Sequence, residues 1–245
     1  MTNTREEMLL DTFVTLSDTL VEDFDLVEVL SLLSERCVEL FDAEAAGVML
    51  VGAGGALQLL ASSSERMRLL ELFELQRDEG PCPDCYRSGE PVVAADLRQA
   101  TERWPTFAAE ALRTDFQAVH ALPMRVRRDT IGALNLFRNT VGTLSEADLR
   151  AARALADVAT LSILQHRSPG DAQGLARQLQ QALNVRVVIE QAKGVLAERS
   201  KVNMEEAFLL LRRYARDQHQ RLNQVALDVT EGTLQASALG TAPRP

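Results

Sequence analysis

The sequence predicts an α+β protein in two parts: an antiparallel sheet flanked by helices, followed by a bundle of three helices. Two observations predict the sheet, namely short apolar runs joined by a glycine-rich turn and a later apolar run with little polar alternation. A third predicts the bundle, because after about residue 175 the apolar residues recur at the three- and four-residue steps of amphipathic helices. A chain of 245 residues is long enough for one or two domains.

Two helices are predicted before the sheet. Residues 4–21 have the seam spacing of a coiled coil, and one such seam requires a partner. A second helix should run from Asp25 to Phe41, opened by a capping box of Asp25 with Glu28. Within it Cys37 has the spacing of a core residue, and we interpret it as a small buried hydrophobe. The seam residues of the first helix are Leu9, Phe13, Leu16 and Leu20.

A β-hairpin is predicted next. Its strands are residues 46–51 and 57–61, and Gly52-Ala-Gly-Gly55 between them supplies turn positions with positive φ. The run 130–137 has little polar alternation, so it should be a central strand covered on both faces. The elements expected after the hairpin are a helix over 64–76, a strand over 91–95, a helix over 105–113, and strands over 119–127 and 130–137.

Residues 78–85 hold the most distinctive chemical motif, Cys82-Pro-Asp-Cys85. Gly80, Pro81 and Pro83 predict a non-helical loop here. A single CxxC supplies half of a tetrahedral zinc site and no second pair follows, so we expect no metal. As a redox pair it lacks the helix N-terminus that lowers a thiol pKa. We therefore favour a pair without special chemistry, and leave open a redox-responsive or ligand-contacting role for Cys82 and Cys85.

A helix from Ser145 to about His166 carries small residues that permit close approach of a second helix. We expect its seam to pair with that of residues 4–21, both within the chain and across a dimer. Ser168-Pro-Gly-Asp171 then interrupts the helical pattern. After this break, helices are predicted over residues 185–197, 204–216 and 222–234, and a capping box of Asn203 with Glu206 opens the second of them.

Charge is distributed unevenly along the chain. The net charge of −9, taken whole, argues against nucleic acid as a partner, because neutralisation of phosphates dominates such binding. However, residues 1–169 hold sixteen basic and twenty-seven acidic residues, whereas residues 170–245 hold ten and eight. The C-terminal part is therefore mildly basic, with its arginines grouped.

Several classes are disfavoured by what the sequence lacks. No apolar run approaches the length of a membrane span, and the N-terminus does not have the order of a signal peptide, so we expect a cytoplasmic protein without a membrane partner. Three cysteines do not suggest a disulfide scaffold. We find no phosphate-cradling glycine loop, GxSxG or HExxH, and therefore expect no catalytic residues and no enzyme. The acidic cluster and lysine of a phosphoacceptor receiver are absent too.

The C-terminal part resembles an ANTAR domain, the RNA-binding output module of bacterial transcription antiterminators. The resemblance lies in Arg186-x-Val-Ile-Glu-Gln-Ala-Lys-Gly-Val-Leu196, Glu206-Ala-Phe208, Leu211-Arg-x-Tyr-Ala-Arg216 and Val225-Ala226. It implies binding to RNA hairpins in a nascent transcript, in competition with a terminator. Two bundles on one transcript would gain affinity through effective concentration, so we expect a homodimer.

The resemblance assigns RNA contact to cationic residues that would otherwise pass for an ordinary solvated helix surface. Arg186 and Lys193 are seven residues apart, so both should point away from the apolar face of their helix. Gly194 costs about 1 kcal/mol relative to alanine inside a helix, which suggests a close approach by RNA or by a neighbouring helix. The RNA-contact residues expected are Arg186, Lys193, Gly194, Arg212, Arg213 and Arg216.

The first part resembles a GAF domain, the small-molecule sensor fold. The carrying features are the hairpin Gly47–Ala61, Glu79-Gly-Pro-Cys82 with Gly89-Glu-Pro-Val92, and Ile131-Gly-Ala-Leu-Asn-Leu136. This implies a small-molecule ligand of unknown identity, with any cofactor equally unknown. The expected boundaries are a bundle helix over 1–24, a GAF-like sensor over 25–166, a linker over 167–174, an ANTAR-like domain over 175–236 and a disordered tail over 237–245.

Two other functions stay open at this point. Some stand-alone GAF folds reduce methionine sulfoxide with loop cysteines, so a thiol enzyme or redox sensor that uses Cys82 and Cys85 is the main alternative. A scaffold that binds only protein is the other. On the favoured hypothesis, the state of the sensor alters the helices over residues 145–183 and thereby the RNA-competent arrangement.

Overall fold

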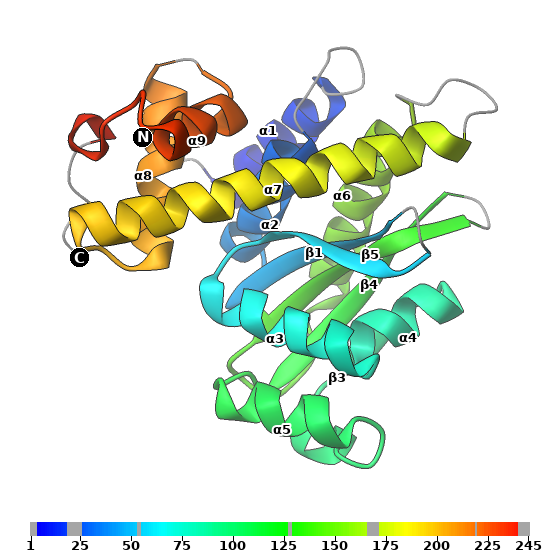
Figure 1. Cartoon of the computed structure of the whole chain (residues 1–245). Helices are drawn as coiled ribbons and strands as arrows, with labels where there is room; N and C mark the ends of the chain where they lie inside the picture. The colour runs from blue at the N-terminus through cyan, green and yellow to red at the C-terminus, as the bar shows by residue number, and fades with distance from the viewer. Residues whose placement is uncertain are drawn as a thin grey trace. The chain divides into compact units, whose positions relative to one another are not determined.

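The computed structural model describes residues 4–18, 26–52, 55–126, 129–165, 172–218 and 220–239, apart from the side chains of residues 165 and 172–179 (Figure 1). The chain divides into two compact units between Leu179 and Gln180. Unit 1 contains the sheet, and unit 2 contains the C-terminal helices. In the described part of the chain, no helix is both long and apolar enough to cross a lipid bilayer.

Unit 1 is built on an antiparallel sheet of five strands in the order β2-β1-β5-β4-β3. The predicted central strand is confirmed, because β5 has two strands on either side. Gly132 in β5 permits its close approach to β1, since a Cβ there would collide with the carbonyl oxygen of Met49. The strands are β1 Ala45–Val51, β2 Leu57–Ser62, β3 Val92–Ala94, β4 Ala118–Val126 and β5 Asp129–Arg138.

Helices cover both faces of the sheet, as Figure 1 shows. On one face lie α2 (Leu26–Leu40) and α6 (Glu146–Gln165), with α1 (Arg5–Asp18) packed against both. The other face carries α3 (Glu65–Arg77), α4 (Pro81–Ser88) and α5 (Pro105–Arg113), together with the short helix η1 (Leu97–Ala100). Alternate residues of β5 face opposite layers, so Ala133 and Phe137 belong to the core beneath the second set of helices.

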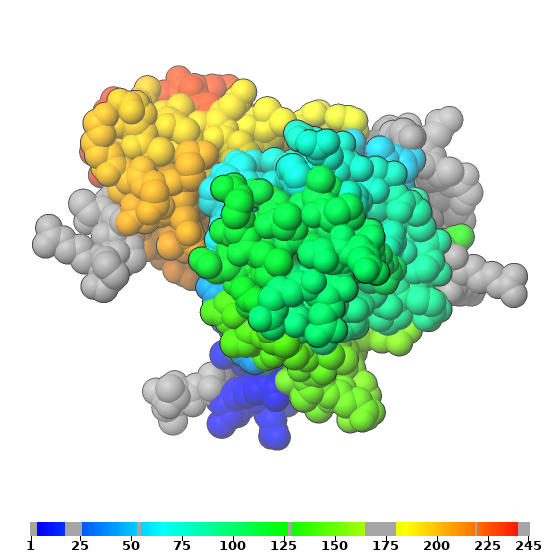
Figure 2. Space-filling model, turned by 90° about the horizontal axis from the view of Figure 1, so that it is seen from below, coloured from blue at the N-terminus to red at the C-terminus, as the bar shows by residue number. Residues whose placement is uncertain are grey.

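The two predicted seams do pair within the chain. The hydroxyl of Ser162 in α6 donates to the carbonyl of Leu16 in α1 at 3.1 Å, and Leu16 is fully buried. Arg5 forms an ion pair with Asp148 near the N-terminal ends of the same two helices. Figure 2 shows the two helices side by side at one end of unit 1. Pairing across a dimer stays a prediction, and the seam residue Leu20 and the capping residue Asp25 lie outside the described residues.

The prediction of a non-helical loop over residues 78–85 is wrong, because α4 begins at Pro81. Gly80 precedes the helix with φ of 147°, a conformation that favours glycine. Pro81 then occupies the first helical position, where its missing N–H costs nothing and its fixed φ suits the helix. The preceding helix ends at Arg77, with Asp78 in the left-handed region, and Gly80 and Pro81 then start a new helix.

Unit 2 is the predicted three-helix bundle. Its first helix is the C-terminal portion of α7 (Ala172–Ser200), and α8 (Met204–Asp217) and α9 (Leu222–Glu231) follow. The capping box of Asn203 with Glu206 is confirmed. The third helix ends at Glu231, three residues earlier than predicted, and Gly232 follows it with φ of 80°. The core residues include Ile189, Ala192 and Leu196 of α7, Ala207, Leu211 and Ala215 of α8, and Val225, Ala226 and Val229 of α9.

The prediction that the tail is disordered from residue 237 is wrong for its first residues. A short helix, η2 (Ala236–Leu239), ends in Leu239, which is buried. The guanidinium of Arg213 in α8 donates to the carbonyl of Leu239 at 3.0 Å. One apolar side chain and one hydrogen bond thus dock this turn on the bundle, and residues 240–245 lie outside the described residues.

Candidate functional site

Lys193 is buried between α7 and α8, with 5% of its surface exposed. Its Nζ donates to both carboxylate oxygens of Glu190, at 2.9 and 3.0 Å, and lies 5.6 Å from the ring centre of Phe208. The expectation that Lys193 points away from the apolar face is therefore wrong. The sequence did contain the contrary signal, because Lys193 is four residues after Ile189 and three before Leu196, and so shares their face.

A second cation shares the ring of Phe208. The guanidinium carbon of Arg212 in α8 lies 5.8 Å from the ring centre, at a distance typical of a cation–π contact. Lys193, Phe208 and Arg212 therefore form one cluster at the crossing of α7 and α8, which we call the α7–α8 cluster. Glu190 compensates one of its two positive charges.

The other expected RNA-contact residues are placed differently. Arg216, one turn beyond Arg212, has 80% of its side chain exposed and a distant ion pair with Asp217 at 4.0 Å. Arg186 is half-buried, two turns before Lys193 on the same side of α7. Arg213 holds η2 in place. The structure thus groups Arg212 with Lys193, exposes Arg216, and gives Arg213 a structural contact.

Gly194 is exposed and faces a groove on unit 2. A Cβ built on it would meet no described atom within 4 Å. The expectation that a neighbouring helix approaches this glycine is therefore not met among the residues the structure describes. The groove has a volume of about 610 Å³ and is lined by Gln191, Gly194, Val195, Glu198, Arg199 and Thr230. Sequence reasoning missed Gln191, Glu198 and Arg199, although their spacing around Gly194 places them on one side of α7.

Replacing Lys193 by alanine should destabilise the bundle by about 1–3 kcal/mol, because it leaves Glu190 without its cation and opens space beside Phe208. Faster hydrogen exchange of the α7 and α8 amides would report this loss. Lys201→Ala is the control, since it removes an exposed pair with Glu198 that contributes little. Loss of RNA binding by Lys193→Ala with unchanged exchange would instead mean that the ammonium contacts RNA directly.

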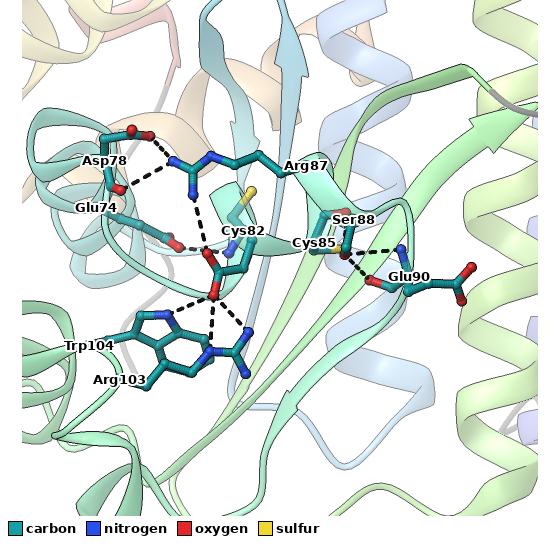
Figure 3. Close-up of polar contacts among 10 residues, drawn as sticks. Glu74, Asp78, Cys82, Cys85, Arg87, Ser88, Glu90, Arg103 and Trp104 are labelled. Carbon is teal, nitrogen blue, oxygen red and sulfur yellow. Dashed lines mark hydrogen bonds and ion pairs between the residues drawn. The ribbon is translucent and has the colours of Figure 1, made fainter.

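In unit 1 the CxxC motif forms part of α4, as Figure 3 shows. Both Cys82 and Cys85 are free thiols and fully buried. The N–H of Cys82, at the second position of the helix, donates to Glu74 Oε1 at 2.8 Å. The expectation that this pair lacks a helix N-terminus is therefore wrong. Nevertheless, burial raises the pKa of both thiols, that of Cys85 to about 12, and so keeps them protonated.

Side chains around α4 fix its position. Asp84 accepts hydrogen bonds from the indole of Trp104 at 3.1 Å and from Arg103 at 2.7 Å (Figure 3). Glu79 accepts from the backbone N–H groups of Thr106 and Phe107, at 2.7 and 2.8 Å, and so caps α5. The thiol-bearing helix is thus tied to the segment after it by charge-assisted hydrogen bonds.

A buried acidic cluster lies beneath α4 and was not anticipated. Glu71 and Glu74 of α3 are both fully buried, and Glu71 accepts a hydrogen bond from Asn135 of β5 at 2.8 Å. Gly47 and Gly80 provide the space, because a Cβ on either would collide with one of these carboxylates. The signal in the sequence was the spacing of Glu71 and Glu74 with the apolar residues of their helix, which puts both on its inner face.

Burial raises the pKa of the Glu74 carboxyl well above its ordinary value. The hydrogen bond from Cys82 opposes this shift, whereas the charges of Glu71 and Asp84 increase it. Oε2 of Glu74 has no hydrogen-bond partner in the described ranges. Burial therefore favours the neutral form of Glu74, and its charged form would destabilise the packing under α4.

Alkylation of Cys82 and Cys85 should be about a hundredfold slower or more in the native chain than in the unfolded chain at pH 8, because both thiols are buried and protonated. Mass spectrometry of labelled peptides measures this. We further expect the RNA affinity of the wild type to be the same under oxidant and reductant, and equal to that of the double variant Cys82→Ser with Cys85→Ser. Rapid labelling together with an oxidant-dependent RNA affinity would favour the redox alternative.

Family models match both parts of the chain. The GAF domain model matches residues 25–163, and the ANTAR domain model matches residues 177–229. The second match covers the α7–α8 cluster and Gly194. A comparison with curated proteins finds no match.

Solved structures resemble unit 1. The GAF domain from a phosphoenolpyruvate-protein phosphotransferase of Coxiella burnetii has a TM-score of 0.51 at 17% identity, covering 66% of this chain and 96% of that one. The corresponding GAF domain from Acinetobacter gives 0.49 at 15%, covering 63% and 92%. Free methionine-R-sulfoxide reductase from Neisseria meningitidis, solved with its substrate, gives 0.49 at 15%, covering 70% and 91%. At such identities, the likeness to the Coxiella domain shows the fold alone.

Proposed function

Because the chain belongs to the GAF domain family and carries an ANTAR domain after its sheet, we propose that it is a signal-responsive regulator that binds RNA hairpins in nascent transcripts and acts by antitermination. The observation that carries the proposal is the order of the two matches, a sensor-type domain followed by an RNA-binding type of domain. Both are regulatory rather than catalytic kinds of domain, so we do not assign it an enzymatic reaction.

The residues proposed to contact RNA lie on unit 2. Arg212 and Arg216 stand one turn apart on α8, where guanidinium groups can pair with phosphates or stack on unpaired loop bases. Arg186 supplies a further cation on α7. Lys193 and Arg213 support this surface without contacting RNA themselves. Lys193 holds Phe208 in position, and Arg213 holds η2. This division replaces a uniform cationic surface with three contact residues, Arg186, Arg212 and Arg216, and two supporting ones, Lys193 and Arg213.

The positive electrostatic potential that attracts RNA should be confined to unit 2. Most of the acidic excess lies in residues 1–169, so a polyanion would be repelled by unit 1 as a whole. A single small bundle makes few contacts, and its affinity would be modest. We therefore propose a homodimer that engages two hairpins at once, because the second contact then benefits from effective concentration.

The sensor is proposed to act through the helices over residues 145–183. α7 runs without interruption from Ala172 to Ser200, across the division between the units. A helix is stiff over such a length, so a change of state in unit 1 that rotates or frays its first turns would alter the bundle it enters. The ligand would bias one of two arrangements by binding it more tightly.

A transcription assay tests the proposal. The full chain is added to a polymerase elongating through two short hairpins that overlap a terminator. We expect the fraction of transcripts that pass the terminator to rise with protein concentration, and to stay constant when the hairpin loops are scrambled. Readthrough that ignores the hairpins, or that does not respond to the protein at concentrations where it binds the RNA, would rule out antitermination.

A further inference from the structure

The groove beside Gly194 is separate from the α7–α8 cluster. Gln191, Gly194 and Glu198 recur at steps of three and four, so they line one side of α7. Lys193 points to the other side, toward Phe208. Thr230 of α9 closes the groove opposite, which gives it two helical walls within unit 2.

The glycine at the floor of this groove is not required by the fold. Its backbone is helical, and a Cβ would meet no described atom within 4 Å. Alanine would therefore fit and would favour the helix. A glycine that neither turn geometry nor internal packing requires is accounted for by a ligand that approaches the backbone closely.

The groups around the groove match a nucleobase better than a phosphate or an apolar peptide. Val195 offers an apolar wall for a flat ring, while the amide of Gln191 and the carboxylate of Glu198 can pair with a base edge. A phosphate would be repelled by Glu198. Arg199 lies at the same rim and can take the neighbouring phosphate.

Two residues at the edge of the groove, Glu198 and Thr230, already make contacts that are compatible with binding a base. Glu198 pairs with Lys201 at 2.6 Å, but both side chains are largely exposed, so the pair is readily exchanged for another donor. The hydroxyl of Thr230 donates to the carbonyl of Leu227 at 2.8 Å and so offers only its acceptor side to a ligand. Glu198 and Thr230 therefore both present acceptors, which suits a base edge that carries an amino group.

We infer that this groove binds one unstacked, amino-bearing base of an RNA hairpin loop, with Gly194 as the floor and Glu198 as the acceptor for the amino group. The inference rests on the proposed function and adds base selectivity to it. The α8 arginines supply affinity through phosphates, whereas the groove reads one base. Single-stranded loop bases are the usual target of sequence-specific RNA recognition, because their edges are free.

Gly194→Leu tests the inference by filling the floor of the groove with a residue that favours helix. In fluorescence anisotropy titrations of the full chain with a labelled hairpin, we expect the Kd to rise about tenfold to a hundredfold, as for loss of a stacked and paired base. Gln181→Leu, which adds the same side chain at an exposed position of α7 outside the groove, should leave the Kd unchanged. Far-UV circular dichroism shows whether both variants keep their helix content.

Glu198→Met provides the second arm, because it keeps a side chain of similar length while removing both carboxylate acceptors. Hairpins are compared in which each loop base in turn is replaced by uracil. We expect one loop position at which the replacement by uracil lowers the affinity of the wild type about tenfold and that of Glu198→Met little. If Gly194→Leu and Gln181→Leu bind RNA like the wild type while Arg212→Glu with Arg216→Glu does not, the groove is no base site although RNA binding stands. If Gly194→Leu leaves the Kd for RNA unchanged but alters the sedimentation coefficient, the groove is a contact between protein chains and the inference fails.

Discussion

Reversing the charges of Arg212 and Arg216 together will weaken binding of hairpin RNA by about a hundredfold at low salt. Each guanidinium lost from a phosphate removes a charge-assisted hydrogen bond, and each glutamate adds repulsion. The slope of log K against log salt should also become less steep by about two, since two fewer counterions are released. Anisotropy titrations of the full chain over a salt series measure both quantities.

The matched control reverses two arginines of unit 1, Arg113 and Arg150. Their side chains are 76% and 72% exposed and pair with neighbouring glutamates, much as Arg216 pairs with Asp217. The change in net charge is identical in the two double variants. If both lose affinity equally, the effect reports net charge alone, and α8 is not the surface that RNA contacts.

The second large effect concerns the stability of unit 1. Relative to Glu74→Gln, the wild type should become less stable as pH rises above about 4.5, the ordinary pKa of a glutamate, by up to about 1.4 kcal/mol per pH unit. The direction of this pH dependence follows from the burial of the Glu74 carboxyl. The folded-state pKa is raised, so the stabilisation by neutral Glu74 is complete below the unfolded pKa and is lost as pH rises toward the folded pKa.

Urea unfolding at pH values from 4.5 to 8 tests this. Trp104 is the only tryptophan and is buried in unit 1 against Phe107, so its fluorescence reports the unit that contains Glu74. Glutamine keeps an acceptor for the N–H of Cys82 but does not titrate. Parallel stability curves for wild type and variant over this range would contradict the conclusion that burial favours the neutral form of Glu74.

Local patterns in the sequence were enough to predict most of the helices and strands. The hairpin, the central strand and the capping box of Asn203 with Glu206 depend on residues close to one another in the chain. The start of α4 is an exception, because a local pattern there allows two interpretations. Proline disfavours the interior of a helix but favours its first turn, and sequence alone did not distinguish the two positions for Pro81.

At the candidate site the spacing of Lys193, Glu71 and Glu74 indicates their helix face, but the partners that stabilise them there come from distant residues. Lys193 is buried because Phe208 covers it, and the stem of a lysine is apolar enough to allow this. The acidic cluster depends on Gly47 and on Asn135, which is 64 residues from Glu71. Docking of η2 likewise depends on Arg213 reaching Leu239 across 26 residues. Periodicity identifies which face of a helix a residue occupies, but not what another element places against that face.

We propose that unit 2 binds folded RNA, and a single titration distinguishes this from the alternatives. The full chain is titrated against an RNA with two short hairpins, each hairpin alone, and a DNA duplex of equal length, from low to moderate salt. We expect saturable binding that is tightest for the paired hairpins, with log K falling linearly as log salt rises. Absence of binding to any hairpin at low ionic strength, or equal affinity for the DNA duplex, would contradict it.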